Sequence, residues 1–170
     1  MAAILWAATF SVSGGFPAAR SFPRFVDDVI VLVRSSDRPV SQRDGGVRII
    51  PIPQGISLAD ALAIGVGALP DDVDQVLLYD GEEPSADALE VLDGVGDGWC
   101  VALADMTETV KIVDAGLVTG TLDRDTVLRV RTPQAATRAA LAAVIADAGF
   151  SFSAMPSRAA RLGIPVTTVR

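Results

Sequence analysis

The chain has 170 residues, of which 50% are hydrophobic and only 5% aromatic, and its formal net charge is −7. This length supports one domain with a full core, the negative charge excludes a nucleic-acid backbone as the expected partner, and no apolar run reaches the ~18 residues of a membrane helix. The single cysteine, Cys100, excludes an intrachain disulfide, and the lack of histidine excludes histidine-based catalysis and histidine metal ligands.

The first apolar run, Ala2–Ala8, predicts either a buried strand or the core of a signal peptide. No basic region precedes it, which favours the strand and a cytoplasmic protein. Gly14 and Gly15 then predict a turn, which could lie beside an anion or be a plain turn. We expect strands over Val26–Arg34 and Val47–Ile52, joined by a polar loop over 35–46.

Ser57–Leu69 has helical spacing, and Ser57 with Asp60 forms a capping-box-like start. Asp71–Asp80 predicts a central strand that ends in an acid. Ligands of α/β proteins bind at the carboxyl ends of such strands, so Asp80 is a candidate binding residue, although a plain turn residue is equally expected there. A short helix over Pro84–Leu92 and a buried strand over Trp99–Ala104 follow.

Two runs rich in Val, Thr and Ile flank Asp114-Ala115-Gly116, which predicts a β-hairpin. A second turn at 123–125 precedes an alternating apolar and basic strand, Val127–Arg131. The remaining pattern predicts a helix over Ala135–Ala148, a helical turn over Ser157–Leu162 and a last strand over Ile164–Val169. Buried strands alternating with helices indicate an α/β fold with a mostly parallel sheet.

Three short motifs occur in a fixed order in this region: Glu108-Thr109-Val110-Lys111, Thr121-Leu122-Asp123-Arg124 and Arg131-Thr132-Pro133-Gln134. Together they resemble a segment of the methylerythritol phosphate cytidylyltransferases, which are nucleotidyltransferases of isoprenoid precursor synthesis. The resemblance covers nearly the whole chain and implies a divergent and shortened member of this family. It implies a Rossmann-like three-layer sandwich over residues 1–170, with a protruding β-arm at 105–131.

The resemblance also implies where ligands bind. Asp80 would hold Mg²⁺ or the ribose–phosphate region of CTP, because a hard cation suits a carboxylate. Thr109 and Arg124 match arm residues that reach the substrate phosphate of a neighbouring subunit, which implies a dimer paired through the arm. The implied nucleotide-binding residues are Ala7, Ala8, Gly14, Gly15, Gly55 and Asp80.

Several cations of the family's site have no counterpart here. The glycine-rich loop lacks its arginine and lysine, Glu83 stands where the family has an arginine, and the family's C-terminal active-site lysine is not matched. Lys111 is the only lysine among the 170 residues. Phosphoryl transfer depends on positioning and charge stabilisation, and loss of one stabilising group can cost ~10²- to 10³-fold in rate.

Three hypotheses follow. The first is a degenerate cytidylyltransferase-like protein of low or no activity that forms a homodimer or heterodimer through its arm, and supports a partner subunit or binds a nucleotide weakly. The second is an active CTP-dependent nucleotidyltransferase with a site rebuilt from Arg20, Arg24 and Asp80. The third is a structural dimer without a ligand, in which Thr109 and Arg124 are only a cross-strand pair that stabilises the arm.

Overall fold

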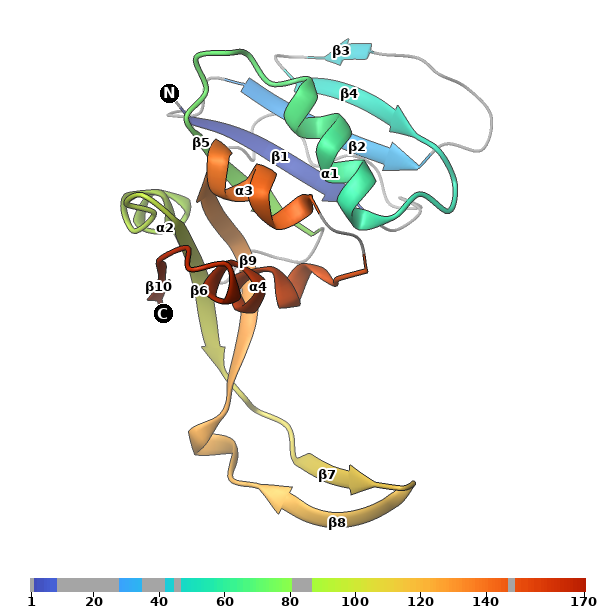
Figure 1. The fold of residues 1–170 in the computed structure, drawn as a ribbon, viewed down its shortest axis with the longest axis vertical. Helices are drawn as coiled ribbons and strands as arrows, with labels where there is room; N and C mark the ends of the chain where they lie inside the picture. The colour runs from blue at the N-terminus through green and yellow to red at the C-terminus, as the bar shows by residue number, and fades with distance from the viewer. Residues whose placement is uncertain (1, 9–27, 35–41, 45–46, 81–86, 147–148) are drawn as a thin grey trace.

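The computed structural model describes residues 2–8, 28–34, 42–44, 47–80, 87–146 and 149–170. Within these residues the body of the protein is built on an eight-stranded sheet with the strand order β10-β6-β9-β5-β1-β2-β4-β3 (Figure 1). Its strands are β1 Ala2–Ala8, β2 Asp28–Arg34, β3 Gln42–Asp44, β4 Val47–Ile52, β5 Gln75–Tyr79, β6 Trp99–Asp105, β9 Leu128–Thr137 and β10 Val166–Val169.

The sheet is mixed but mostly parallel. β1 pairs in parallel with β2 and β5, β2 with β4, and β6 with β10. β9 lies antiparallel between β5 and β6, and the short β3 is antiparallel to β4 at one edge. The apolar run Ala2–Ala8 is therefore a strand in the interior of the sheet, as predicted.

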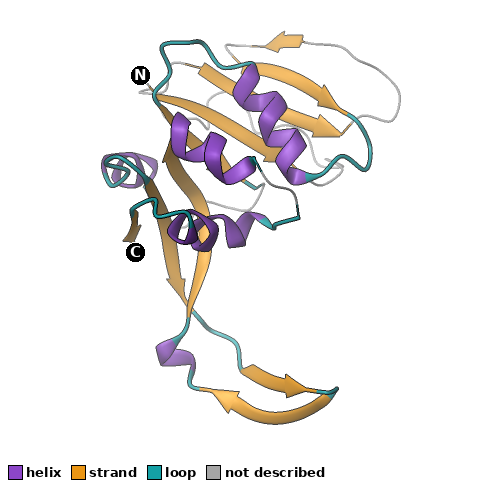
Figure 2. Cartoon of the chain, in the orientation of Figure 1, coloured by secondary structure: helices purple, strands orange, loops and turns teal. Residues whose placement is uncertain are grey.

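Helices cover both faces of this sheet (Figure 2). α1 (Leu58–Gly67), α3 (Arg138–Ile145) and α4 (Met155–Arg161) share one core with residues such as Leu78, and α2 (Ala88–Asp93) packs on the opposite face. Each fully buried Leu or Val contributes about 1.5–3 kcal/mol. The predicted three-layer α/β architecture is confirmed. No helix among the described residues is long and apolar enough to span a membrane.

Capping side chains fix the ends of α1. The hydroxyl of Ser57 accepts a hydrogen bond from the backbone amide of Asp60 at 3.1 Å, as the capping-box pattern predicts. At the other end, Arg138 donates to the carbonyls of Pro70 and Val66, and Arg48 donates to that of Ala68. Positive groups near a helix C-terminus interact favourably with the negative end of the helix dipole. Arg48 and Arg138 therefore stabilise α1, although both lie outside this helix in the sequence.

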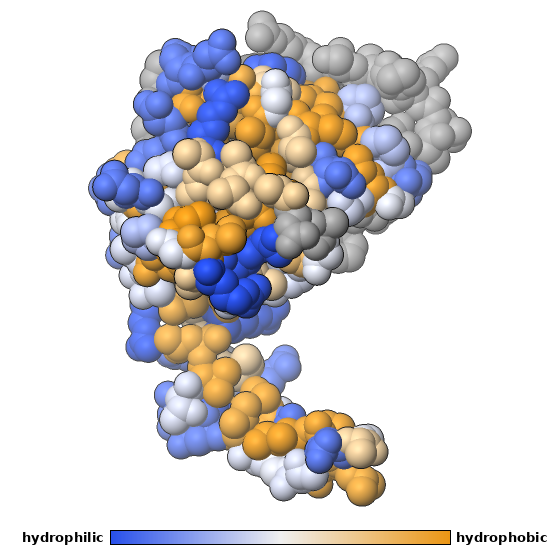
Figure 3. Space-filling model, in the orientation of Figure 1, coloured by the Kyte–Doolittle hydropathy of each residue, from blue (hydrophilic) through white to orange (hydrophobic). Residues whose placement is uncertain are grey.

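A separate two-stranded sheet forms an arm that protrudes from the body (Figure 1). It consists of β7 (Val110–Asp114) and β8 (Leu117–Leu122). Ala115 and Gly116 between them both have positive φ, 47° and 81°, as a two-residue type I′ hairpin requires. The predicted hairpin is therefore confirmed, and apolar surface runs along it (Figure 3).

The predicted helix over Ala135–Ala148 is wrong at its start. Ala135 and Ala136 are fully buried in β9, and pairing with β5 on one side and β6 on the other outweighs the helical preference of alanine. Thr137 ends the strand, and its hydroxyl accepts from the amide of Ala140 to cap α3.

Three other elements also differ in their bounds from those predicted from the sequence. Part of the expected loop over 35–46 is the strand β3. α2 begins at Ala88, because the Asp87 carboxylate accepts from the amides of Leu89 and Glu90 and caps it there. Pro84, the expected start of this helix, lies outside the described residues. The helical turn expected at Ser157 is the helix α4, preceded by a 3-10 turn over Phe152–Ala154.

Candidate active site

The carboxyl ends of four parallel strands define one edge of the sheet. Trp6 of β1 pairs with Tyr79 of β5, so the backbone of Ala7 lies beside Asp80, which follows β5 directly. Ala8 pairs with Val33 at the end of β2. The structure therefore brings Ala7, Ala8 and Asp80 to the edge at which α/β proteins bind ligands.

Gly55 lies at the same edge, three residues after β4 ends at Ile52. Its φ of +75° is in the left-handed region, and a Cβ built there meets no atom within 4 Å, so the surface beside it is open. Gly14 and Gly15, and also Arg20 and Arg24, lie outside the described residues.

Strand β9 fixes the position at which β5 ends. The paired register stops at Leu78 and Gln134, because the next residue of β9, Pro133, has no N–H to donate. The buried hydroxyl of Thr132 donates instead to the carbonyl of Leu78 at 3.4 Å. Asp80, two residues further on, is half-buried at the rim. The Thr132-Pro133-Gln134 motif therefore holds the strand that carries the candidate metal ligand.

Tyr79 precedes Asp80 and faces α2. It is 4% exposed, and burial raises its pKa to about 12, with the nearby charge of Asp87 adding to the effect. The hydroxyl therefore stays protonated at neutral pH.

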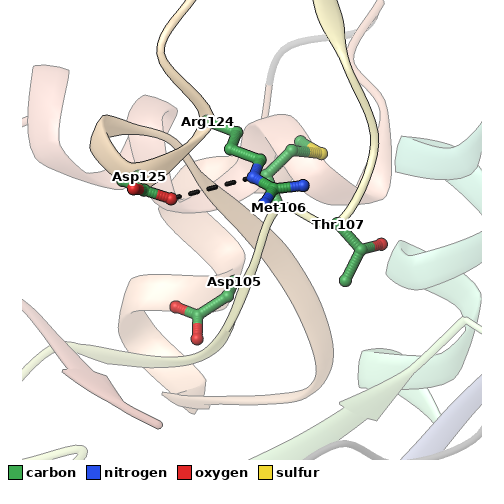
Figure 4. Close-up of a pocket in the computed structure, with 5 residues that line it drawn as sticks. All are labelled: Asp105, Met106, Thr107, Arg124 and Asp125. Atoms are coloured by element: carbon green, nitrogen blue, oxygen red, sulfur yellow. Dashed lines mark ion pairs between the residues drawn. The ribbon is translucent and has the colours of Figure 1, made fainter.

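The arm begins at the same edge. β6 runs in the direction of β5, since both pair antiparallel with β9, and it continues to Asp105 before the chain enters the arm. At the root of the arm lies an open pocket of about 390 Å³ (Figure 4). Its lining residues are Asp105, Met106, Thr107, Arg124 and Asp125.

Arg124 reaches across this pocket from a 3-10 turn, η2 (Arg124–Thr126), toward the segment 105–107. Its Nε lies 3.8 Å from Oδ1 of Asp125, and the side chains are 62% and 86% exposed. Such an exposed pair is worth at most about 1 kcal/mol, so it does little to hold the guanidinium in one place.

Thr109 is exposed on the segment that leads into β7 and is not one of the residues that line the pocket. The alternative of a cross-strand Thr109–Arg124 pair is wrong, because both residues lie outside the β7–β8 ladder, which starts at Val110 and Leu122. The side-chain bond across the arm joins Lys111 Nζ to Thr121 Oγ1 at 2.7 Å.

Asp80 suits a divalent metal that arrives with a nucleotide. Within the described ranges, no three His, Cys, Asp or Glu side chains gather into a cage for a metal. Mg²⁺ in phosphoryl-transfer sites is typically held by one or two carboxylates together with substrate phosphates. Among the described residues, one carboxylate that directly follows a strand fits that arrangement.

Sequence reasoning missed most of the pocket at the arm root. No motif marks Asp105, Met106 and Thr107. Their position between a buried strand and a hairpin was the only sequence feature that could have indicated a pocket there. Asp125 was identified only as part of a turn. These residues come together because β6 and β9 enter and leave the arm side by side.

Comparisons with known proteins agree with this architecture. Residues 17–169 match the family model of 2-C-methyl-D-erythritol 4-phosphate cytidylyltransferase. A 4-diphosphocytidyl-2C-methyl-D-erythritol synthase from Anaerococcus prevotii superposes with a TM-score of 0.74 at 21% identity, over 99% of this chain and 85% of that one. The bifunctional IspDF from Campylobacter jejuni gives a TM-score of 0.70 at 12% identity, over 99% of this chain and 49% of that one.

Sequence relatives point the same way. A bifunctional enzyme IspD/IspF from Anaeromyxobacter dehalogenans is 35% identical over 85% of this chain and 40% of its own length. A 2-C-methyl-D-erythritol 4-phosphate cytidylyltransferase from Frankia casuarinae is 33% identical over 76% of this chain and 51% of its own length. The chain thus spans about half or less of the curated relatives it matches. It belongs to the 2-C-methyl-D-erythritol 4-phosphate cytidylyltransferase family.

Proposed function

We propose that this chain is a nucleotide-binding member of the family with little or no turnover of its own, which pairs through its arm and supports the site of a partner subunit. The observation that carries the proposal is the location of the only lysine. Lys111 lies on the arm and donates to Thr121, so these 170 residues offer no lysine to the carboxyl edge that carries Asp80.

The missing cations argue for slow chemistry. A triphosphate site needs several positive groups to stabilise the charge that develops during phosphoryl transfer. Of the arginines in the described core, Arg138 and Arg48 cap α1, and Arg158 donates to the carbonyl of Val144 at the end of α3. These three arginines hold helix ends and do not supply the edge of the sheet.

The arm supports the pairing part of the proposal. Among the described strands, β7 and β8 pair only with each other, and an isolated two-stranded hairpin is marginally stable in water. Contiguous exposed apolar surface is typical of a protein interface. The large apolar side chains of the arm are exposed: Ile112 44%, Val113 59%, Leu117 71%, Val118 65% and Leu122 41%.

In the first hypothesis the chain binds CTP or another nucleotide with Mg²⁺ at Asp80. The metal would supply charge neutralisation to the phosphates. The backbone at Ala7, Ala8 and Gly55 would leave space for the nucleotide, and Asp80 would hold the metal. Arg124 and Thr109, on the arm, would act on the substrate phosphate of the partner subunit.

Pyrophosphate release from CTP and methylerythritol phosphate with Mg²⁺ tests the low activity. Because several charge-stabilising groups are absent, we expect a rate at least about 10⁴-fold below that of an intact family member assayed in parallel.

The second hypothesis, an active enzyme with a rebuilt site, predicts a different result. Turnover within about tenfold of the intact enzyme, abolished in Asp80→Asn, would overturn the proposal of low activity. For the third hypothesis, a structural dimer, CTP with Mg²⁺ should leave the melting temperature unchanged, because a ligand that binds only the folded state must raise it.

A further inference from the structure

One face of the arm is formed by three apolar side chains. Val110 pairs with Leu122, and Ile112 points to the same side, because residues of a strand alternate between the two faces of a hairpin. Lys111 points to the other side, where its Nζ donates to the hydroxyl of Thr121. The only lysine of the chain therefore lies on the opposite face of the arm from these three apolar side chains.

Charged residues flank this face at the root and at the tip of the arm. The exposed ones at the root are four acids and two bases: Asp105, Glu108, Asp123, Arg124, Asp125 and Arg129. Asp114, the last residue of β7, is exposed at the tip. Neither Glu108 nor Asp114 forms an ion pair with another described residue. The root therefore has a net charge of −2 and the tip a charge of −1.

Two copies that pair through this face would bring like charges together. A two-fold interface is self-complementary, so it joins the same surface patch of both copies. The arm protrudes from the body (Figure 3), and two bodies cannot occupy the same space, so paired arms overlap from opposite ends. The root of each arm then lies at the tip of the other, and Glu108 of each copy approaches Asp114 of the other. The homodimer therefore combines an apolar contact with repulsion at both of its ends.

We propose that the arm is adapted to a partner other than a second copy of this chain: a protein surface that is apolar at its centre and positively charged where Glu108 and Asp114 approach it. Complementary charges orient and speed association, and like charges disfavour the wrong partner. The net charge of −7 adds repulsion between copies. Copies still pair through the apolar face, but the oppositely charged partner pairs more tightly. That the arm is a pairing surface rests on the proposed function.

A charge-reversed copy of this chain is the probe for such a partner. The double variant Glu108→Lys with Asp114→Lys keeps the three apolar side chains and changes two exposed positions. Native mass spectrometry of equal amounts of this variant and nitrogen-15-labelled wild type separates the two homodimers from the heterodimer. We expect the heterodimer to be about nine-tenths of all dimers, against about half for indifferent pairing, because each homodimer should be roughly tenfold weaker.

The single variant Glu108→Lys tests the root-to-tip arrangement of the arms. It sets a lysine against Asp114 of the other copy at both ends of the pair. Its homodimer should therefore have a dissociation constant roughly tenfold below that of the wild type in analytical ultracentrifugation. Raising the salt concentration from about 0.02 M to about 0.5 M should remove most of this gain, because the Debye length falls to a few ångströms.

Asp71→Lys with Asp72→Lys is the matched control. It changes the net charge as much as the double variant of the arm does. Both residues are exposed in the turn before β5, at the sheet edge opposite the one from which the arm leaves. Mixed with wild type, this variant should form about half heterodimer, because charges more than a Debye length from the interface are largely screened.

Three results would each overturn the inference: a heterodimer share near one half for the double variant of the arm, an equal excess for the control variant, or a Glu108→Lys dimer no tighter than that of the wild type. Each of these results would leave pairing through the arm in place. The absence of dimers at tens of micromolar in every mixture would instead refute the pairing on which the inference rests, and the inference with it.

Discussion

Replacing Ile112 and Leu122 of the arm together with Asp should convert a dimer into a monomer. The register of the arm pairs Val110 with Leu122, Lys111 with Thr121, and Ile112 with Gly120. Side chains alternate between faces, so Val110, Ile112 and Leu122 form one apolar face, and Lys111 and Thr121 lie on the other. We expect the apolar face to be the one that pairs.

The expected loss is large because each apolar side chain buried in the dimer contributes about 1.5–3 kcal/mol. Two such side chains per protomer, replaced by carboxylates that resist burial, should weaken the dimer at least ~100-fold. Analytical ultracentrifugation of wild-type and variant protein over micromolar concentrations measures the change. Neither arm strand pairs with a described strand of the body's sheet, so the melting of the core should hardly change.

Thr121→Asp is the matched control for the pair of arm substitutions. It adds a carboxylate to the same arm, but on the face of Lys111, whose Nζ lies 2.7 Å from the Thr121 hydroxyl. The variant should remain dimeric. A wild type that sediments as a monomer at tens of micromolar, or a double variant that keeps the dimer, would refute pairing through this face.

Gln134→Leu should strongly destabilise the core. Gln134 is fully buried. Its Oε1 accepts from Trp99 Nε1 at 3.0 Å, and its Nε2 donates to the carbonyl of Phe152 at 3.1 Å. Leucine has a similar size but leaves both partners unsatisfied, and each buried polar group without a partner costs about 1–3 kcal/mol.

The free energy of unfolding should therefore fall by about 2–5 kcal/mol, a large part of the ~5–15 kcal/mol of a typical domain. Urea titration followed by circular dichroism measures it. Gln54→Leu, at an exposed position after β4, serves as the control and should change stability by less than about 0.5 kcal/mol. A loss below about 1 kcal/mol for Gln134→Leu would mean that the network is not a major part of the core.

The sequence predicted the elements whose signals are local. Ser57 caps α1 through its own neighbour Asp60, and the turn at 114–116 depends on residues that adopt positive φ. The start of α3 was misplaced because Ala135 and Ala136 have a helical preference, while their actual state is set by β5 and β6 on either side. Such pairing is invisible in a local pattern.

The same distinction between local and non-local signals applies to the residues of the candidate site. Asp80 could be predicted because an acid directly after a buried strand lies at a known kind of edge. The residues that line the pocket at the root of the arm could not, because the pairing of β6 with β9 brings them together and a local pattern does not show it. The structural use of Arg48 and Arg138 at the end of α1 was hidden for the same reason.

The most direct test of the central claim is complementation in trans. An active family member whose own arm threonine and arginine are replaced by alanine is assayed for pyrophosphate release, alone and mixed with this chain. If Thr109 and Arg124 support a partner's site, the mixture should release pyrophosphate at least about tenfold faster than the two proteins alone, and Arg124→Ala in this chain should abolish the gain. A rate equal to the sum of the separate proteins would contradict the account.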